Sequence, residues 1–254
     1  MKVVAIANYK GGTCKTTTCV NLASALVADG KRVGVIDLDP IADATQGFGL
    51  RPASMPHLPY ALVPDEPAPL LDGFVDTEWG IRVLPSGKKM RAGLAMVLQE
   101  HPAGSGALRD AIAAMPEGAF DYLILDCPGQ FSEVLTHAMV AADSVVIPID
   151  VKSPGAVTEM TELARHCVEG GGHLGGILPC RTDSTRLTRD VLSQLEGSAY
   201  GQWLWRDDQG TIMIRNTVRV PEARYAGRPI LTHAPDSSAA LDYTRFARVI
   251  GGAQ

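Results

Sequence analysis

The run Lys10-Gly-Gly-Thr-Cys-Lys-Thr-Thr17 constrains this chain more than any other stretch. It follows the apolar segment 3–7 and opens a helical pattern near residues 15–29. Glycine tolerates backbone angles that let several N–H groups point into one cavity, and the first turn of a helix adds its positive dipole end. A lysine followed by a threonine supplies a cation for phosphate oxygens and a hydroxyl for Mg²⁺. The run therefore predicts a phosphate-binding loop between a strand and a helix.

The predicted loop departs from the strict pattern G-x-x-x-x-G-K-[ST], because Asn8 and Cys14 stand at the two outer glycine positions. A plain glycine turn leading into an amphipathic helix is therefore the alternative. On the phosphate-loop interpretation, Lys15 reaches the terminal phosphates and the Thr16 hydroxyl ligates Mg²⁺. The predicted nucleotide-binding residues are Gly11, Gly12, Thr13, Cys14, Lys15, Thr16 and Thr17.

Short apolar runs alternate with helical patterns along the chain. The predicted strands are 3–7, 32–37, 81–84, 122–126, 144–149 and 174–179, and the predicted helices are 15–29, 106–115, 131–142, 154–168, 186–197 and 237–250. Alternation of this kind predicts an α/β fold, a doubly wound and mostly parallel sheet with helices on both faces. Ligands of such folds bind at the carboxyl edge of the sheet. Together with the loop, this predicts a P-loop NTPase.

The length of 254 residues suits one large domain, and we expect residues 1–254 to form a single unit. Six prolines lie between positions 52 and 69. This density disfavours regular structure, and the strand pattern resumes afterwards. The stretch 52–69 is therefore expected to be a proline-rich surface excursion within the domain.

Composition excludes several classes of protein. Hydrophobic residues make up 46% and charged residues 20%, which argues against a disordered or fibrous chain. The net charge of −5 means that any nucleic-acid contact needs a local basic patch. Five cysteines without a C-x-x-C pair disfavour a disulfide framework or a zinc site and fit a reducing compartment. No apolar run approaches the length of a membrane span, so we expect a soluble, cytoplasmic protein.

Four stretches, in order, resemble motifs of one family. The run 10–17 resembles the deviant Walker A motif of the ParA/MinD class of P-loop ATPases, in which a lysine precedes the glycines. Residues 35–40 (VIDLDP) resemble its switch I segment, and residues 122–128 (YLILDCP) resemble its Walker B strand. Residues 218–223 (VRVPEA) and 227–230 (GRPI) resemble a run typical of ParA/Soj-type partition ATPases. The resemblance covers the chain apart from the proline-rich stretch.

The resemblance implies roles for individual side chains. Lys10 is expected to cross a nucleotide-sandwich dimer and touch the partner's ATP phosphates, where a second cation offsets the charge of phosphoryl transfer. Lys15 and Asp39 complete the expected catalytic set, with Asp39 orienting the attacking water. Asp126, at the end of an apolar strand, is expected to hold Mg²⁺ together with Thr16. For Asp37, a place in the Mg²⁺ shell and a purely structural role are both open.

Three residues depart from the family pattern. Cys14 replaces a glycine, so its Cβ is expected to restrict the loop and weaken ATP binding or hydrolysis. Its thiol lies at a predicted helix N-terminus beside Lys15, which makes redox sensitivity an alternative to a simple packing role. Gly129 stands where a second proline is common, which is expected to loosen switch II, and Ile41 replaces a common glutamine.

A basic segment is the candidate DNA surface. Residues 211–228 hold four arginines, and Glu222 is the only acidic residue there. In ParA proteins this surface binds DNA without sequence preference, through phosphate contacts that weaken with salt. Pairing of each arginine with a nearby carboxylate is the alternative. The predicted DNA-binding residues are Arg219, which sits in a matched motif, followed by Arg215, Arg189 and Arg224.

The resemblance implies a partition ATPase with ATP and Mg²⁺ as cofactors, slow intrinsic hydrolysis and an ATP-dependent homodimer that binds nonspecific DNA. A ParB-like or adaptor protein is the expected partner that stimulates hydrolysis, with nucleoid association in the ATP state. No basic amphipathic tail follows the last predicted helix, so no membrane contact is expected. Alternatives are a positioning ATPase for a protein cargo, a non-hydrolysing nucleotide-binding scaffold and a dethiobiotin-synthetase-like metabolic enzyme. A nitrogenase-like iron protein is disfavoured because Cys127 lacks a suitable second cysteine.

Overall fold

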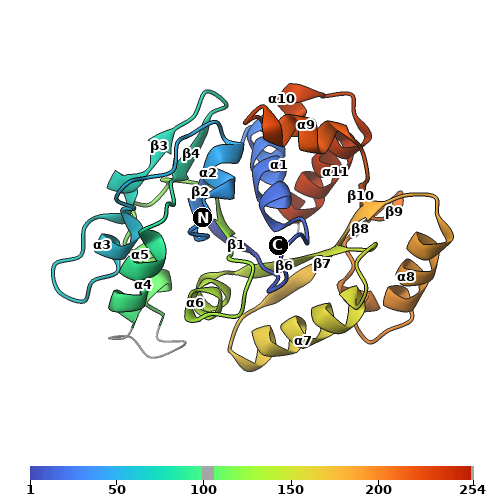
Figure 1. Ribbon diagram of the computed structural model, residues 1–254, viewed down its shortest axis with the longest axis horizontal. Helices are drawn as coiled ribbons and strands as arrows, with labels where there is room; N and C mark the ends of the chain where they lie inside the picture. The colour runs from blue at the N-terminus through green and yellow to red at the C-terminus, as the bar shows by residue number, and fades with distance from the viewer. Residues whose placement is uncertain (99–105, 253–254) are drawn as a thin grey trace.

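The structure, a computed structural model, describes residues 1–98 and 106–252. Within this part, eight strands form one sheet in the order β10-β7-β6-β1-β5-β2-β4-β3 (Figure 1). All neighbours pair parallel except β3, which runs antiparallel to β4. The strands are β1 (Lys2–Ile6), β2 (Val33–Asp37), β3 (Val75–Asp76), β4 (Ile81–Leu84), β5 (Tyr122–Asp126), β6 (Ser144–Asp150), β7 (Leu174–Thr182) and β10 (Ile214–Arg215).

Helices cover both faces of this sheet (Figure 1). One face carries α1 (Lys15–Ala28), α2 (Asp43–Gly47), α9 (Arg219–Tyr225), α10 (Ile230–His233) and α11 (Ser238–Gly252). The other face carries α3 (Leu58–Ala61), α4 (Met90–Leu98), α5 (Ala107–Ala113), α6 (Glu133–Ala141) and α7 (Ala156–Glu169). The helix α8 (Arg186–Glu196), the 3-10 turns η1 (Leu70–Gly73) and η2 (Gly201–Trp203), and the antiparallel pair β8 (Arg206–Asp207) and β9 (Gly210–Thr211) complete the described elements.

Alternate side chains of each central strand enter two separate cores. In β1, Val3 and Ala5 pack with the α4–α7 layer, whereas Val4 and Ile6 pack with α1 and α11. Burial on both faces explains why these strands read as unbroken apolar runs in the sequence. The prediction of a doubly wound, mostly parallel α/β sheet with the P-loop NTPase architecture is confirmed.

The strand order places three loops next to one another at the carboxyl edge. β5 lies between β1 and β2, and Asp126 at its end is in register with Asp37 at the end of β2. The glycine-rich loop follows β1 directly. The side chains that the motifs singled out therefore converge at one edge, where ligands of such sheets bind.

The prediction that 52–69 has no regular structure is wrong at α3, one helical turn within this stretch. Leu58 is completely buried there and Leu62 nearly so, because both pack into the α4–α7 core. Proline at the second position of α3 is compatible with a helix start, since the first turn needs no N–H donor there. Strand β7 also continues past the predicted end at residue 179 to Thr182. None of the described helices is both long and apolar enough to cross a membrane.

Candidate nucleotide site

The glycine-rich loop turns sharply into α1. Gly12 and Cys14 both adopt the left-handed backbone conformation, with φ of 81° and 67°. Among the described side chains none caps the N-terminus of α1, so the N–H groups of its first turn remain available to a ligand. A Cβ added at Gly11 would meet no atom within 4 Å, which leaves open space over the loop. This geometry suits an anion such as a phosphate group.

Asn8, which departs from the strict loop pattern, is an anchor for the loop. Its side chain is buried, and Nδ2 donates to the backbone oxygen of Pro148 in β6 at 2.9 Å. Its Oδ1 accepts from the Lys10 N–H at 3.0 Å. A glycine could make neither bond, so the substitution ties the start of the loop to the neighbouring strand.

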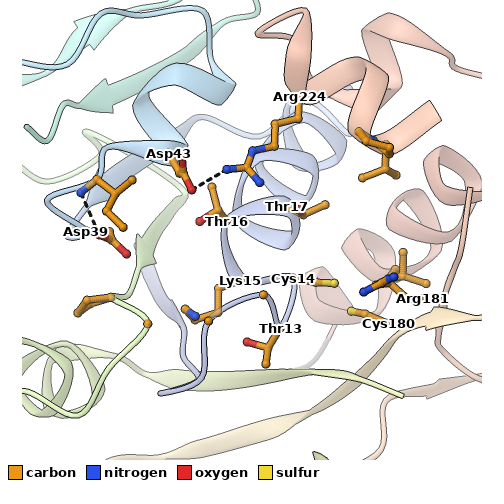
Figure 2. A pocket seen from close by; sticks show the side chains of 18 of the residues that line it. Thr13, Cys14, Lys15, Thr16, Thr17, Asp39, Asp43, Cys180, Arg181 and Arg224 are labelled. Carbon is orange, nitrogen blue, oxygen red and sulfur yellow. Dashed lines mark hydrogen bonds and ion pairs between the residues drawn. The ribbon is translucent and has the colours of Figure 1, made fainter. Parts of the chain in front are cut away.

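Lys15 is buried and its side chain curves back over the loop (Figure 2). The ammonium donates to the backbone oxygen of Lys10 at 2.9 Å. Burial lowers its pKa, which the nearby Asp126 carboxylate partly opposes. Gly129 approaches this ammonium closely, because a Cβ there would lie 3.2 Å from Nζ. The absence of a side chain at 129 thus leaves room for the Lys15 ammonium.

Thr16 and Asp126 form the part of the site that fits a cation. The Thr16 hydroxyl donates to Asp126 Oδ2 at 2.9 Å. Asp126 Oδ1 is buried and has no hydrogen-bond partner in the part of the chain that the structure describes. Burial and the neighbouring Asp37 raise the pKa of Asp126. A cation bound beside this carboxyl group would lower that pKa and favour the ionised form. An orphaned carboxylate oxygen beside a hydroxyl matches the donors that Mg²⁺ prefers.

Among residues 1–98 and 106–252 no group of three or more His, Cys, Asp and Glu side chains could hold a metal ion unaided. Mg²⁺ commonly binds through one or two protein ligands, with waters and substrate phosphates completing its shell. Thr16 and Asp126 fit the protein's share of such a shell.

Asp37 lies in a buried hydrogen-bond network. Its Oδ2 accepts from the backbone N–H and the hydroxyl of Thr45 in α2, at 2.8 and 2.6 Å, and its Oδ1 accepts from the Asp39 N–H at 3.1 Å. The Thr45 hydroxyl in turn accepts from the Ser86 N–H at 3.0 Å. Burial raises the pKa of Asp37 to about 7. These bonds give Asp37 a structural role, holding α2 against the end of β2.

Asp39 and Lys10 occupy different surroundings. Asp39 lines the cavity, and its carboxylate accepts from the Ile41 N–H at 3.0 Å (Figure 2). Lys10 does not line it: its ammonium pairs with Glu159 in α7 at 2.6 Å and donates to the Pro154 oxygen at 3.2 Å. In this single chain Lys10 is thus directed away from its own loop, toward α7.

A cavity of about 760 Å³ extends from the loop. It reaches residues that the sequence analysis did not assign to the site: Arg91, Cys180, Arg181, Asn216, Thr217, Val220, Pro221 and Tyr243. Cys180 and Arg181 lie near the carboxyl end of β7, and Asn216 directly follows β10. The position of Cys180 and Arg181 near the carboxyl end of a predicted strand could have indicated that they belong to the site. Strand β10 could not be predicted, because two residues are too few to form a sequence pattern.

Cys14 contacts Cys180 in the wall of this cavity. Figure 2 shows both sulfur atoms directed toward each other, while the Cys180 thiol donates to the backbone oxygen of Leu178 at 3.4 Å. The neighbouring Cys180 thiol lowers the pKa of Cys14, while burial raises the pKa of Cys180. The Thr18 hydroxyl lies 3.3 Å from the Tyr243 Oη in the same buried cluster.

The four predicted DNA-binding arginines have distinct partners. Arg215 makes a two-pronged pair with Asp242, whose carboxylate is 2% exposed, at 2.7 Å. Arg219 pairs with Glu222 at 2.9 Å on the exposed face of α9. Arg224 pairs with Asp43 in α2 at 2.7 Å and lines the cavity (Figure 2). Arg189 lies on α8, well apart from α9, and its guanidinium donates to the backbone oxygen of Ser184 at 2.8 Å (Figure 1).

Comparison with known proteins defines the family. A family profile described as an AAA domain matches residues 1–167. The chromosome partitioning protein ParA of Caulobacter vibrioides is 31% identical over 263 residues, covering 98% of this chain and 94% of that protein. The chain belongs to the ParA/Soj family of P-loop ATPases. The chromosome-partitioning ATPase Soj of Thermus thermophilus is 34% identical over 253 residues, covering 97% of this chain and 94% of the relative.

A solved structure supports the fold of this ParA/Soj-family chain. The cobyrinic acid a,c-diamide synthase of Mycobacterium smegmatis, with a bound ATP analogue and magnesium, is 26% identical and has a TM-score of 0.79. The match covers 98% of this chain and 94% of that one. The resemblance predicted from the four motifs is therefore confirmed at the level of family and fold.

Proposed function

We propose that this ParA/Soj-family ATPase binds ATP with Mg²⁺, closes into a homodimer, and in that state holds nonspecific DNA while it positions a plasmid, chromosome or protein cargo. One observation carries the proposal: a single cavity extends from the phosphate loop to Arg224 of α9, within the basic segment 211–228. A ligand in this cavity would touch both parts. Its occupancy can therefore control the basic surface.

The loop residues have separate tasks in nucleotide binding. The N–H groups of the 11–16 turn and the Lys15 ammonium bind the phosphate oxygens, and Lys15 then exchanges the Lys10 carbonyl for a phosphate. Thr16 and Asp126 hold Mg²⁺. Bound Mg²⁺ supplies positive charge that offsets the charge on the phosphate oxygens. Asp39 turns from the Ile41 N–H to orient the attacking water.

Lys10 provides the link to dimerisation. Its ammonium is directed toward α7 and away from its own loop, so it cannot serve its own nucleotide without rearranging. We infer that it leaves Glu159 when two chains meet and binds the phosphates held by the partner subunit. Hydrolysis then depends on the dimer, because the second cation is present only there.

The basic surface of α9 provides the DNA contact. Arg219 is half-exposed and has only a solvent-exposed glutamate as its partner, so a DNA phosphate can compete for it. Arg228 is exposed and forms no ion pair with the described residues. A ParB-like or adaptor protein is the proposed stimulator of hydrolysis. We place the protein in the cytoplasm, on the nucleoid when ATP is bound.

A DNA titration with the nucleotide varied tests this function. We expect retention of random-sequence duplex DNA with ATP or a slowly hydrolysed analogue plus Mg²⁺, and release with ADP. Arg219→Ala should lower the affinity about tenfold at moderate salt and reduce the salt slope by about one, because one phosphate contact is lost. Arg165→Ala, on the exposed face of α7, is the matched control and should leave DNA binding unchanged.

Each alternative predicts a different result of the same titration. Tight nucleotide-dependent dimers without turnover would indicate a non-hydrolysing scaffold. Turnover with neither dimerisation nor a response to DNA would indicate a metabolic P-loop enzyme. Equal DNA affinity with ATP and with ADP would contradict the proposed coupling between the cavity and α9.

A further inference from the structure

Two cysteines far apart in the sequence meet at the phosphate loop. Cys14 precedes α1 and Cys180 lies near the carboxyl end of β7, in register with Ile214 of β10. Their sulfur atoms face each other, and both residues line the cavity at the phosphate loop (Figure 2). All five cysteines are free, and Cys14 is the one that is partly exposed, whereas Cys180 is buried behind it.

Phosphate binding does not account for a thiol at position 14. The residue adopts a φ of 67°, a conformation that glycine reaches without strain and a residue with a Cβ does not. Its side chain is directed at Cys180, away from Lys15 (Figure 2). Strain retained at a ligand-binding loop is a reason to look for a function of the residue that bears it.

We propose that Cys14 and Cys180 form a reversible disulfide that closes the phosphate loop to nucleotide. Hydrogen peroxide oxidises the accessible Cys14 thiol to a sulfenic acid and is itself reduced to water. The Cys180 sulfur then attacks the Cys14 sulfur, the S–S bond forms, and the sulfenic oxygen leaves as a second water molecule. A dithiol reductant reverses the step by thiol–disulfide exchange.

The disulfide should weaken nucleotide binding, an expectation that rests on the proposed function and on the length of the S–S bond. An S–S bond of about 2.05 Å is much shorter than a non-bonded contact between two sulfur atoms. Its formation draws Cys14 toward β7. The N–H groups of Thr13 and Lys15 flank Cys14, so they leave the geometry that a phosphate needs. Because the coupling is reciprocal, a bound nucleotide should in turn slow formation of the disulfide.

Peptide mapping after peroxide treatment tests the bond itself. Trypsin releases Cys14 in the peptide 11–15 and Cys180 in the peptide 166–181, which also contains Cys167. Mapping in the Cys167→Ser variant assigns the link without ambiguity, because Cys180 is then the one cysteine of the peptide 166–181. Cys167 itself is buried in α7. We expect the linked pair of peptides after peroxide and its loss after dithiothreitol. Cys14 over-oxidised or unmodified, with no link to Cys180, would overturn the proposal.

Nucleotide binding gives an independent readout. Peroxide should weaken the binding of MgADP to the Cys167→Ser protein by about tenfold or more, and dithiothreitol should restore it. Saturating MgADP should slow disulfide formation by about fivefold or more. In Cys180→Ser, compared with its own reduced form, mild peroxide treatment should leave the affinity unchanged. Equal losses with and without Cys180 would contradict the switch. A reduced protein that binds no nucleotide would instead refute the proposed function, and the peptide link would still be tested.

Discussion

Several side chains at the site have partners that the sequence did not reveal. Arg215 was predicted to contact DNA, and in the structure its guanidinium donates hydrogen bonds to the carboxylate of Asp242, which lies 27 residues later in α11. Lys10 was predicted to serve a partner chain, and in this chain it pairs with Glu159. Both ion pairs join segments far apart in the sequence. Motifs identify which side chains carry charge, but only the packed fold determines which charges remain available.

Lys10→Ala should uncouple nucleotide binding from hydrolysis. We expect ATP turnover to fall about 100-fold, because a cation at the transferred phosphate is lost. The affinity for MgADP should change little, since Lys10 does not line the cavity. Steady-state phosphate release and a nucleotide titration measure the two quantities.

Lys152→Ala is the matched control, since Lys152 forms a similarly half-buried pair with Asp183 at 2.5 Å. Each substitution should cost about 0.5 kcal/mol of unfolding free energy. Unchanged turnover in Lys10→Ala would remove the proposed role of Lys10.

Arg215→Ala should destabilise the fold more than Arg219→Ala does. Removing Arg215 leaves the Asp242 carboxylate buried without a cation, which we expect to cost about 2 kcal/mol after allowing for the half-exposed guanidinium. Removing Arg219 breaks an exposed pair and should cost less than about 0.5 kcal/mol. Urea unfolding of both variants measures the difference, and equal losses would contradict the structural role of Arg215.

At the scale of elements, sequence patterns identified most of the long strands and helices, but they missed the nine-residue helix α4 and most of the very short elements. Strands β1, β2 and β5 are buried on both faces, so their apolar runs stand out. Helix α2 has five residues and β10 has two, too few for a periodic pattern, and both are held by tertiary contacts such as Thr45 with Asp37. The phosphate loop was predictable because its residues are contiguous. The rest of the cavity, from Cys180 to Tyr243, depends on how β7, β10 and α11 pack.

The attachment of α2 to β2 should depend on pH through Asp37. Its pKa is about 7 in the folded chain and about 3.9 in an unfolded one, so between these values the folded state holds a proton that the unfolded state has lost. Stability of the nucleotide-free protein should therefore fall as the pH rises through this window, by up to about 1.4 kcal/mol per pH unit from this residue. Asp37→Asn should flatten the profile.

Urea unfolding between about pH 5 and pH 7.5 measures this slope. Asp183→Asn is the control, because the Lys152 ammonium and nearby hydroxyls hold the pKa of Asp183 below its usual range, where it titrates outside the window. If the unfolding free energy falls with pH as steeply in Asp37→Asn as in the unchanged protein, Asp37 is not the group that causes the pH dependence.

At the scale of the whole molecule, three parts of the chain line the same cavity. The phosphate loop follows β1, the Asp39 segment follows β2, and α9 carries Arg224, which bridges back to Asp43 in α2. A nucleotide that moves the Asp39 segment would therefore also move Asp43 and, through the ion pair, Arg224 of the basic surface. Lys10 pairs with Glu159 of α7 and keeps about a third of its side chain exposed to solvent, so the proposed contact with a second chain requires this pair to break.

The mass of the protein in solution tests the central claim most directly. Sedimentation equilibrium with a slowly hydrolysed ATP analogue and Mg²⁺ should give twice the mass of one chain, whereas ADP with Mg²⁺ should give the mass of a single chain. A protein that remains a single chain in millimolar analogue and Mg²⁺ would contradict the account.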